Sequence, residues 1–119
     1  LKWQKKTLDT DIVFCYNRIM MMYMEKDLID YKFSEDRLLD DLKAYIDSTY
    51  DAHYSKSKFQ ATEFIFDSGH GMGFCIGNVL KYAQRYGRKD GYNRKDLQKV
   101  LHYAIMALHV HDIEKKEST

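Results

Sequence analysis

The chain contains no proline and only six glycines in 119 residues, and this shortage of helix breakers constrains its fold more than any other feature. Sandwiches and barrels contain many turns, and turns are rich in proline and glycine. Helices, in contrast, exclude proline and are weakened by glycine. A chain of this length buries one core, with little surface to spare for a second. We therefore predict a single all-α domain over residues 1–119, a compact bundle of about four to five helices.

A first helix is predicted from a cap at Asp9 or Thr10 to about Tyr31, with apolar side chains on two opposite sides. Helices of this kind are usually buried on both sides, which in so short a chain favours contact with a second subunit and hence a homo-oligomer. Burial under the chain's own helices accounts for the pattern equally. The MMMYM run at 20–24 is more typical of adaptable packing than of a site for soft metals.

Ser34 is predicted to cap a second helix, whose acidic first turn suits the helix dipole. Four residues of this helix are expected to face inward: Leu38, Leu42, Tyr45 and Ile46. Residues 48–58 have no sustained period and are predicted to form a loop, followed by a short helix over about 61–67. The SGHGMG motif at 68–73 comes next, and its glycines permit unusual dihedrals and a close approach of the backbone.

Two longer helices are predicted to follow, one ending near Tyr86 with Gly87 as a left-handed cap, and one from a cap at Asn93 to about Lys115. Each has an apolar stripe that we expect to face the core and a polar stripe that we expect to face a ligand. The apolar stripes are Ile76, Val79, Leu80 and Ala83 in the first helix, and Leu97, Leu101, Ala104 and Leu108 in the second. The polar stripes are Asn78, Lys81, Tyr82 and Arg85 in the first, and Asp96, Lys99 and Tyr103 in the second.

Charge is balanced over the whole chain but clustered locally. The net charge of +1 argues against a general nucleic-acid binder. Residues 81–99 nevertheless hold seven Lys or Arg side chains against two Asp, and antiparallel packing of the last two helices would bring both polar stripes together there. Arginine forks and lysine point charges bind phosphate, and tyrosine rings offer flat faces for a base. Solvated helix faces are the alternative interpretation.

The two cysteines, Cys15 and Cys75, lie among apolar residues without the spacing of metal ligands, so we expect reduced thiols and a cytoplasmic setting. No apolar run approaches the roughly 20 residues that a membrane span requires, and no membrane partner is expected. The chain opens at Leu1 rather than at a methionine, so residues can be missing before it.

Residues 50–110 contain an ordered set of motifs: an HY pair, a later acidic residue, a GN-x-x-KY-x-x-R-x-G-x-K block and a DL-x-K-x-x-x-Y helix. The motif residues are His53 and Tyr54, Glu63, Gly77 and Asn78, Lys81 and Tyr82, Arg85, Gly87, Lys89, and Asp96, Leu97, Lys99 and Tyr103. This segment resembles the SaV-like family of small phage proteins, which includes a nucleotide kinase of podophages. Residues 1–49 lie outside the resemblance.

The resemblance implies a kinase that moves a phosphoryl group from a nucleoside triphosphate to a deoxynucleoside monophosphate in the host cytoplasm, without the usual phosphate loop. No GxxxxGK[ST] motif occurs in this chain. In this hypothesis Lys81 and Arg85 are the catalytic cations, because phosphoryl transfer depends on positioning and on neutralising charge. Eight residues would bind the substrates. Lys89 and Lys99 would hold phosphates, Asn78 and Asp96 would orient the cations or bind sugar or base, and Tyr82 or Tyr103 would stack on the base. The HY pair, His53 and Tyr54, completes the set.

No resident metal is expected. His102 and His109 are two turns apart, His111 points to another face, and no carboxylate completes a zinc set. Magnesium carried with the nucleotide is the one cofactor considered. Glu63 and Asp67, one turn apart, can either bind it through phosphate oxygens or form an acidic surface patch.

Two other functions compete with the kinase. An all-α nucleotide pyrophosphohydrolase gathers carboxylates around magnesium, and the second helix offers Glu35, Asp36, Asp40 and Asp41. The EExxE signature of such enzymes is not met, because Leu38 and Leu39 interrupt it and no ExxD follows. The other candidate is a non-enzymatic phage module that binds a nucleotide or a host protein. Its support is the two-sided first helix and an extra apolar stripe at Met106, Val110 and Ile113, features that predict self-association equally well.

Overall fold

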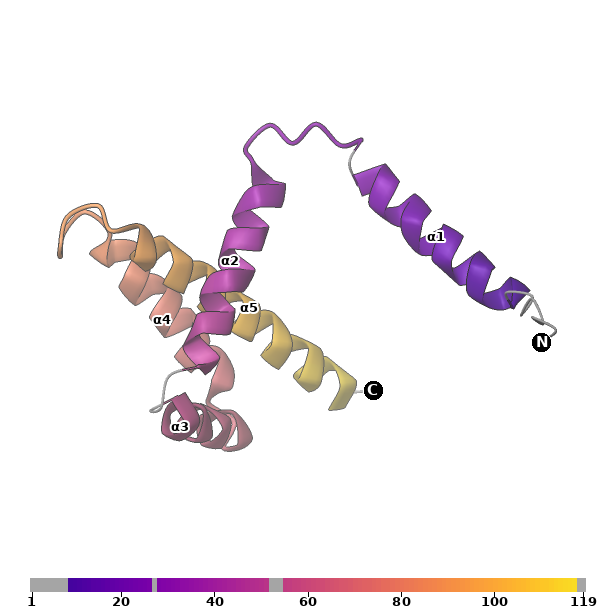
Figure 1. The fold of residues 1–119 in the computed structure, drawn as a ribbon. Helices are drawn as coiled ribbons and strands as arrows, with labels where there is room; N and C mark the ends of the chain where they lie inside the picture. The colour runs from indigo at the N-terminus through magenta and orange to yellow at the C-terminus, as the bar shows by residue number, and fades with distance from the viewer. Residues whose placement is uncertain (1–8, 27, 52–54, 118–119) are drawn as a thin grey trace. The chain divides into compact units, whose positions relative to one another are not determined.

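The computed structural model describes residues 9–26, 28–51 and 55–117, and every regular element within these ranges is a helix. The helices are α1 (Thr10–Lys26), α2 (Glu35–Tyr50), α3 (Ser55–Asp67), α4 (Gly71–Arg85) and α5 (Arg94–Glu117) (Figure 1). The all-α prediction is therefore confirmed. Two compact units divide the chain, Leu1–Glu35 and Asp36–Thr119. Within the described ranges, none of the helices combines the length and the apolar character needed to cross a bilayer.

The first unit contains α1, which begins as predicted and ends early. The Asp9 carboxylate accepts a hydrogen bond from the Asp11 N–H at 3.1 Å, so Asp9 is the cap. The helix ends at Lys26, whereas the prediction extended it to about Tyr31. Beyond it Asp30 pairs with Lys32, and an α-helix does not bring residues two apart to face each other.

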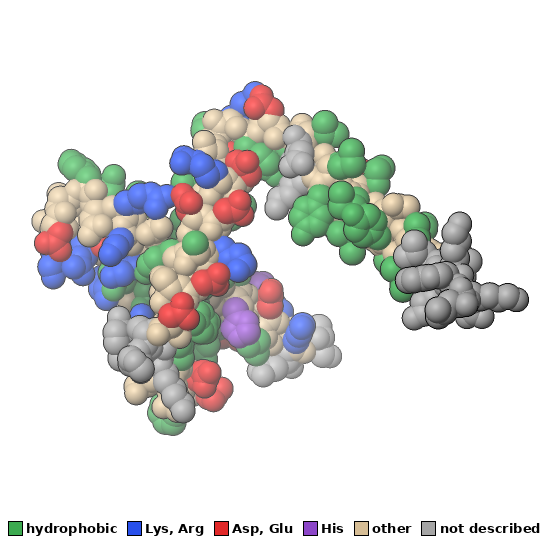
Figure 2. All heavy atoms as spheres, in the orientation of Figure 1, with side chains coloured by type: hydrophobic (Ala, Val, Ile, Leu, Met, Phe, Trp, Pro, Cys, Tyr) green, Lys and Arg blue, Asp and Glu red, His purple; other side chains and the backbone are tan. Residues whose placement is uncertain are grey.

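Both apolar sides of α1 are exposed within its own unit. Phe14 and Tyr23 are 68% and 64% exposed, and Figure 2 shows the hydrophobic side chains of this helix on the surface. Exposed aromatic and methionine side chains on opposite sides of one helix form a large unpartnered apolar surface. The two-sided pattern is thus present, and the described residues of this unit form no core that explains it.

The helix α2 begins one residue after Ser34, which has a φ of +58°, and continues into the second unit. Serine caps usually adopt an extended conformation, and here the side-chain bond at this end comes from the Glu35 carboxylate, which accepts from the Phe33 N–H at 2.9 Å. Of the residues predicted to face inward, Leu42 is buried, whereas Leu38 is 40% exposed. The inward stripe of α2 is therefore narrower than predicted, because this helix contacts its neighbours along one edge.

The predicted loop at 48–58 is wrong at both ends, because α2 continues to Tyr50 and α3 starts at Ser55. The hydroxyls of Ser48 and Thr49 donate to the carbonyls of Tyr45 and Ile46 at 2.6 and 2.7 Å, so these polar residues are satisfied inside a helix. Across the connection, the Tyr50 and Phe59 rings stack with centroids 4.4 Å apart. This stacking holds the end of α2 against α3.

The glycine motif between α3 and α4 serves the core. Gly69 has a φ of +87°, as expected of a glycine that ends a helix. A Cβ added to Gly71 would lie 3.0 Å from the Phe66 ring and 3.1 Å from Val110. The close approach that the glycines were predicted to allow is therefore made to the protein's own side chains. Here Cys75, Ala107 and Val110 form the buried core.

The connection between α4 and α5 follows the predicted turn. Gly87 has a φ of +83° and its N–H donates to the Gly91 carbonyl at 3.0 Å. The Asn93 side-chain oxygen accepts from the Lys95 N–H at 3.0 Å, which confirms Asn93 as the cap of α5. The two helices consequently run antiparallel, side by side (Figure 1). At the start of α5, Arg94 pairs with Asp41 of α2 at 3.1 Å.

The faces of the α4–α5 hairpin are reversed relative to the prediction. The apolar stripes point outward: Ile76 is 45% exposed, Leu80 63%, Leu97 43%, Leu101 49% and Leu108 64%. The helices instead meet along Gly71, Cys75, Asn78, Tyr82 and Arg85 on α4, and along Asp96, Tyr103, Ala107 and Val110 on α5. Small residues let the backbones approach at one end, and an ion pair between Arg85 and Asp96 joins the helices at the other. Most of the polar stripe, with the exception of the exposed Lys81, is therefore the interface between the helices, and the large side chains expected in the core lie at the surface.

Candidate anion-binding site

Two stacked tyrosines form one wall of the candidate site. The rings of Tyr82 on α4 and Tyr103 on α5 lie with centroids 5.9 Å apart and 11° between their planes. Phe74 meets Tyr103 edge-on at 5.8 Å. Offset stacking and edge contacts of this kind are favourable, so the tyrosines are held in place by the hairpin itself.

Three cations surround the Tyr82 ring. The Lys81 ammonium is 4.4 Å, the Lys99 ammonium 4.8 Å and the Arg85 guanidinium carbon 5.9 Å from its centroid. Burial by itself would raise the pKa of the Tyr82 phenol, but the hydrogen bond from Lys81 and the charges of Lys99, Lys81 and Arg85 outweigh burial and lower it. The lowered pKa reflects the positive charges gathered around this ring, as expected of an anion-binding site.

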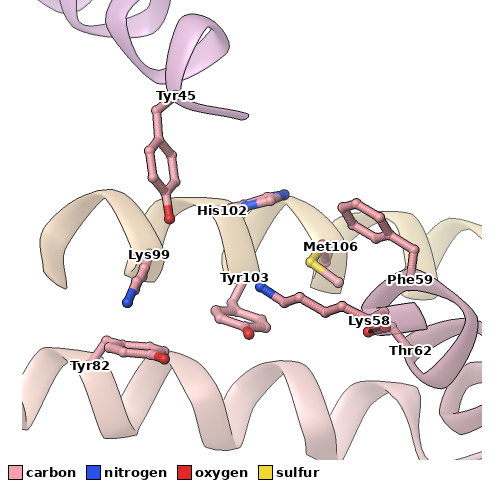
Figure 3. Close-up of a pocket in the computed structure, with 9 residues that line it drawn as sticks. All are labelled: Tyr45, Lys58, Phe59, Thr62, Tyr82, Lys99, His102, Tyr103 and Met106. Atoms are coloured by element: carbon pink, nitrogen blue, oxygen red, sulfur yellow. Dashed lines mark hydrogen bonds between the residues drawn. The ribbon is translucent and has the colours of Figure 1, made fainter. Parts of the chain in front are cut away.

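A small pocket of about 70 Å³ opens beside these rings (Figure 3). Its lining comes from α2, α3, α4 and α5: Tyr45, Lys58, Phe59, Thr62, Tyr82, Lys99, His102, Tyr103 and Met106. In Figure 3 the Lys58 side chain runs from α3 towards the space between His102 and Tyr103, and Lys99 points from α5 towards Tyr82. Two ammonium groups thus face one pocket whose described lining contains no carboxylate.

Six pocket residues were not predicted from the sequence as substrate contacts: Tyr45, Lys58, Phe59, Thr62, His102 and Met106. Burial, and then the charge of Lys58, lower the pKa of the His102 imidazole, so that it stays neutral at pH 7. Burial also raises the pKa of the Tyr103 phenol, which keeps it a hydrogen-bond donor. A helix started at Ser55 would have shown Lys58 at the head of the face that carries Phe59 and Thr62; the predicted loop hid that pattern.

Arg85 lies beside the pocket and is held by carboxylates. Its guanidinium is 3.8 Å from Asp90 and 3.8 Å from Asp96, too far for a hydrogen bond but within range of an ion pair. Asp96 is 3% exposed, and its Oδ2 and the Arg85 Nε are buried without a hydrogen-bond partner. Asp96 therefore orients and partly neutralises Arg85 inside the hairpin.

The remaining predicted residues are more dispersed. Asn78 donates to the Phe74 carbonyl of its own helix at 2.9 Å, and Lys89 is exposed in the α4–α5 turn. His53 and Tyr54 lie outside the described residues. Within the described ranges, no three His, Cys, Asp or Glu side chains are grouped as metal ligands are. Figure 2 shows Lys and Arg side chains gathered towards the turn end of α4 and α5, with acidic side chains spaced along α2.

One family model matches this chain. Residues 48–105, just under half of it, are similar to a family described as a protein of unknown function, DUF3310. The matched segment contains α3, α4 and the part of α5 that carries Lys99 and Tyr103, so most of the pocket lining falls inside it. Neither a curated protein nor a solved structure matches the chain.

Proposed function

We propose that this protein binds nucleotides and transfers a phosphoryl group from a nucleoside triphosphate to a deoxynucleoside monophosphate. The observation that supports this most is the convergence of Lys58 and Lys99 on one pocket without a carboxylate in its described lining. Lys81 adds a third ammonium group outside the pocket lining, 4.4 Å from the centroid of the Tyr82 ring. A phosphate carries the opposite charge and accepts hydrogen bonds from each of them.

In this proposal the acceptor monophosphate occupies the pocket. Lys58 and Lys99 neutralise its charge, while the neutral His102 and the Tyr103 hydroxyl contribute hydrogen bonds without adding charge. The second phosphate chain would lie towards Lys81, which is exposed and has its ammonium over the Tyr82 ring. Arg85 acts as a positioning residue here, because Asp96 and Asp90 already hold its guanidinium.

The transfer itself balances without a general base. An oxygen of the acceptor phosphate attacks the γ-phosphorus, the bond between that phosphorus and the β–γ bridging oxygen breaks, and two nucleoside diphosphates result. Because the acceptor oxygen is already ionised, no proton has to leave it. The lysines lower the barrier by holding the two anions close and in line. Magnesium carried by the triphosphate would supply further positive charge, with phosphate oxygens and water as its main ligands.

The direct test is an assay of the purified chain with a panel of deoxynucleoside monophosphates and a labelled triphosphate, with and without chelator. Label appearing in a deoxynucleoside diphosphate is the expected result. Release of pyrophosphate would indicate the pyrophosphohydrolase instead. Binding of nucleotides without any product would indicate a non-enzymatic module, and either of these outcomes would refute the transfer.

We also propose that the protein is encoded by a phage, acts in the host cytoplasm and self-associates. The outward apolar stripes of α4 and α5 leave large side chains such as Leu80 and Leu108 exposed, at 63% and 64%. Contiguous apolar surface of this kind favours a second copy of the chain. Light scattering on the purified protein is expected to give a mass above 14.2 kDa, and a monomer would contradict the proposal.

A further inference from the structure

A second, larger cavity of about 370 Å³ adjoins the anion pocket. The two share four lining residues: Phe59, Thr62, His102 and Met106. One molecule can therefore occupy both, with a charged group in the small pocket and an uncharged group in the larger space. We call the larger space the aromatic groove.

The aromatic groove differs from the pocket in its chemistry. Its walls are largely apolar or aromatic, from α2, α3 and α5: Ile46, Tyr50, Phe59, Phe66, Ile105 and Met106. Glu63 and His109 add polar groups to the same lining. Flat apolar walls with a few polar groups are the usual surroundings of a bound aromatic ring.

We infer that the aromatic groove holds the base of the nucleotide whose phosphate lies between Lys58 and Lys99. This inference depends on the proposed phosphate pocket, although it does not depend on phosphoryl transfer. The tyrosines that sequence reasoning offered as stacking partners, Tyr82 and Tyr103, stack on each other. The aromatic groove next to the pocket offers the base a stacking surface in place of these two tyrosines.

Different lining residues of the groove would contact different parts of the base. The stacked rings of Tyr50 and Phe59 line the groove, and Ile105 lines it from α5. The Glu63 carboxylate accepts hydrogen bonds from ring or exocyclic N–H groups, and the His109 imidazole is available to a base carbonyl or nitrogen. Thr62 donates to the Lys58 carbonyl at 3.0 Å, so its hydroxyl proton is committed to α3.

The experiment compares two ligands that differ only in the base. Isothermal titration calorimetry would measure binding of a deoxynucleoside monophosphate and of 2-deoxyribose 5-phosphate to the full chain. Since base stacking on aromatic side chains is favourable, we expect the nucleotide to bind about tenfold or more tightly. Ile105→Trp fills the groove from a position outside the lining of the pocket, and it is expected to remove most of this preference while sugar phosphate binding persists.

The matched control is Leu108→Trp, which adds the same ring to α5 at an exposed position outside both cavities, and is expected to keep the preference. Equal binding of both ligands by the wild type, no binding of the nucleotide, or an unchanged preference in Ile105→Trp would each overturn the inference. The wild-type comparison decides the matter even if Ile105→Trp does not fold. Turnover is scored separately, so a chain that prefers the nucleotide but makes no product would refute the kinase and leave the groove assignment standing.

Discussion

The two ends of the α4–α5 hairpin are packed by opposite chemistry. Near α3 the helices meet through Gly71, Cys75 and Val110, which form a dry contact between small and branched side chains. Near the turn they meet through Arg85 and Asp96, whose buried atoms leave hydrogen bonds unmade. Apolar burial stabilises the first end, whereas a buried ion pair adds little net stability and mainly fixes an arrangement. The turn end thus keeps charged groups in place beside the pocket, and the other end holds the hairpin together.

The largest effect predicted from this comparison is a loss of phosphoryl transfer with almost no change in stability. Lys99→Ala should reduce phosphoryl transfer by about 100- to 1,000-fold, the usual loss for one charge-stabilising donor. The free energy of unfolding should stay within about 0.5 kcal/mol of wild type, because Lys99 lies outside the dry contact. Steady-state kinetics and urea unfolding measure the two quantities.

Lys95→Ala is the matched control for that variant. It removes the same charge one turn earlier on α5, from a side chain outside the pocket, and should leave activity intact. A readout without substrate is the pKa of Tyr82 by ultraviolet titration. This pKa should rise in Lys99→Ala and stay unchanged in Lys95→Ala, because Lys99 is among the cations that lower it and Lys95 is not. Equal activity in both alanine variants would remove Lys99 from the site.

The next effect falls on stability at the turn end. Asp96→Ala should destabilise the protein by about 2–3 kcal/mol, somewhat less than the usual loss for breaking a fully buried pair, because the Arg85 side chain is 27% exposed. Asp90→Ala removes the other carboxylate 3.8 Å from Arg85, but that side chain is 67% exposed and the loss should be under about 1 kcal/mol. Urea unfolding of both variants gives the comparison, and similar losses would mean that Asp96 does not orient Arg85.

The opposite end is tested by two glycines of one motif. Gly71→Ala places a methyl group 3.0 Å from Phe66 and 3.1 Å from Val110, and should destabilise the protein by about 1–2 kcal/mol through overpacking. Gly73→Ala meets no atom within 4 Å and should stabilise α4 by about 0.5–1 kcal/mol, because alanine is the better helix former. Thermal unfolding should therefore show shifts of opposite sign, and a shift of the same sign would contradict the packing at Gly71.

Local signals in the sequence predicted the ends of the hairpin well. Gly87 acts through its own backbone and a bond to Gly91, and Asn93 through a bond to Lys95, so their roles do not depend on the rest of the fold. The faces of the helices could not be predicted in the same way. Hydrophobic patterning assigns Leu80 to the core and Asp96 to the opposite face of its helix. The pattern of one helix holds no information on the side chains of another, so it cannot predict that Arg85 pairs with Asp96.

The candidate site was predicted in part for the same reason. Lys81, Tyr82, Lys99 and Tyr103 were identified because they lie on two helices with clear periods, and they do converge. Lys58 was missed because the serines around it suggest a loop, although Phe59 stacks on Tyr50 and closes α3 against α2. This stacking joins two different helices, and the periodicity of a single segment cannot predict it.

The smallest effect predicted is a dependence of stability on pH at the pocket, midway between the two ends of the hairpin. His102 has a pKa lowered by burial and then by Lys58, so the unfolded chain binds a proton more readily than the folded protein does. The contribution of His102 is therefore fully present above its unfolded pKa of about 6.5 and declines as pH falls through that value towards its folded pKa. Unfolding by urea from pH 8 to pH 5 should show wild type losing stability relative to His102→Gln, which cannot take up the proton. Lys58→Met should reduce that difference without abolishing it, because burial, the larger of the two causes, remains. If the difference between wild type and His102→Gln were constant with pH, His102 would not be shielded from water, and the pocket at the centre of the hairpin would be open rather than enclosed by α2 and α3.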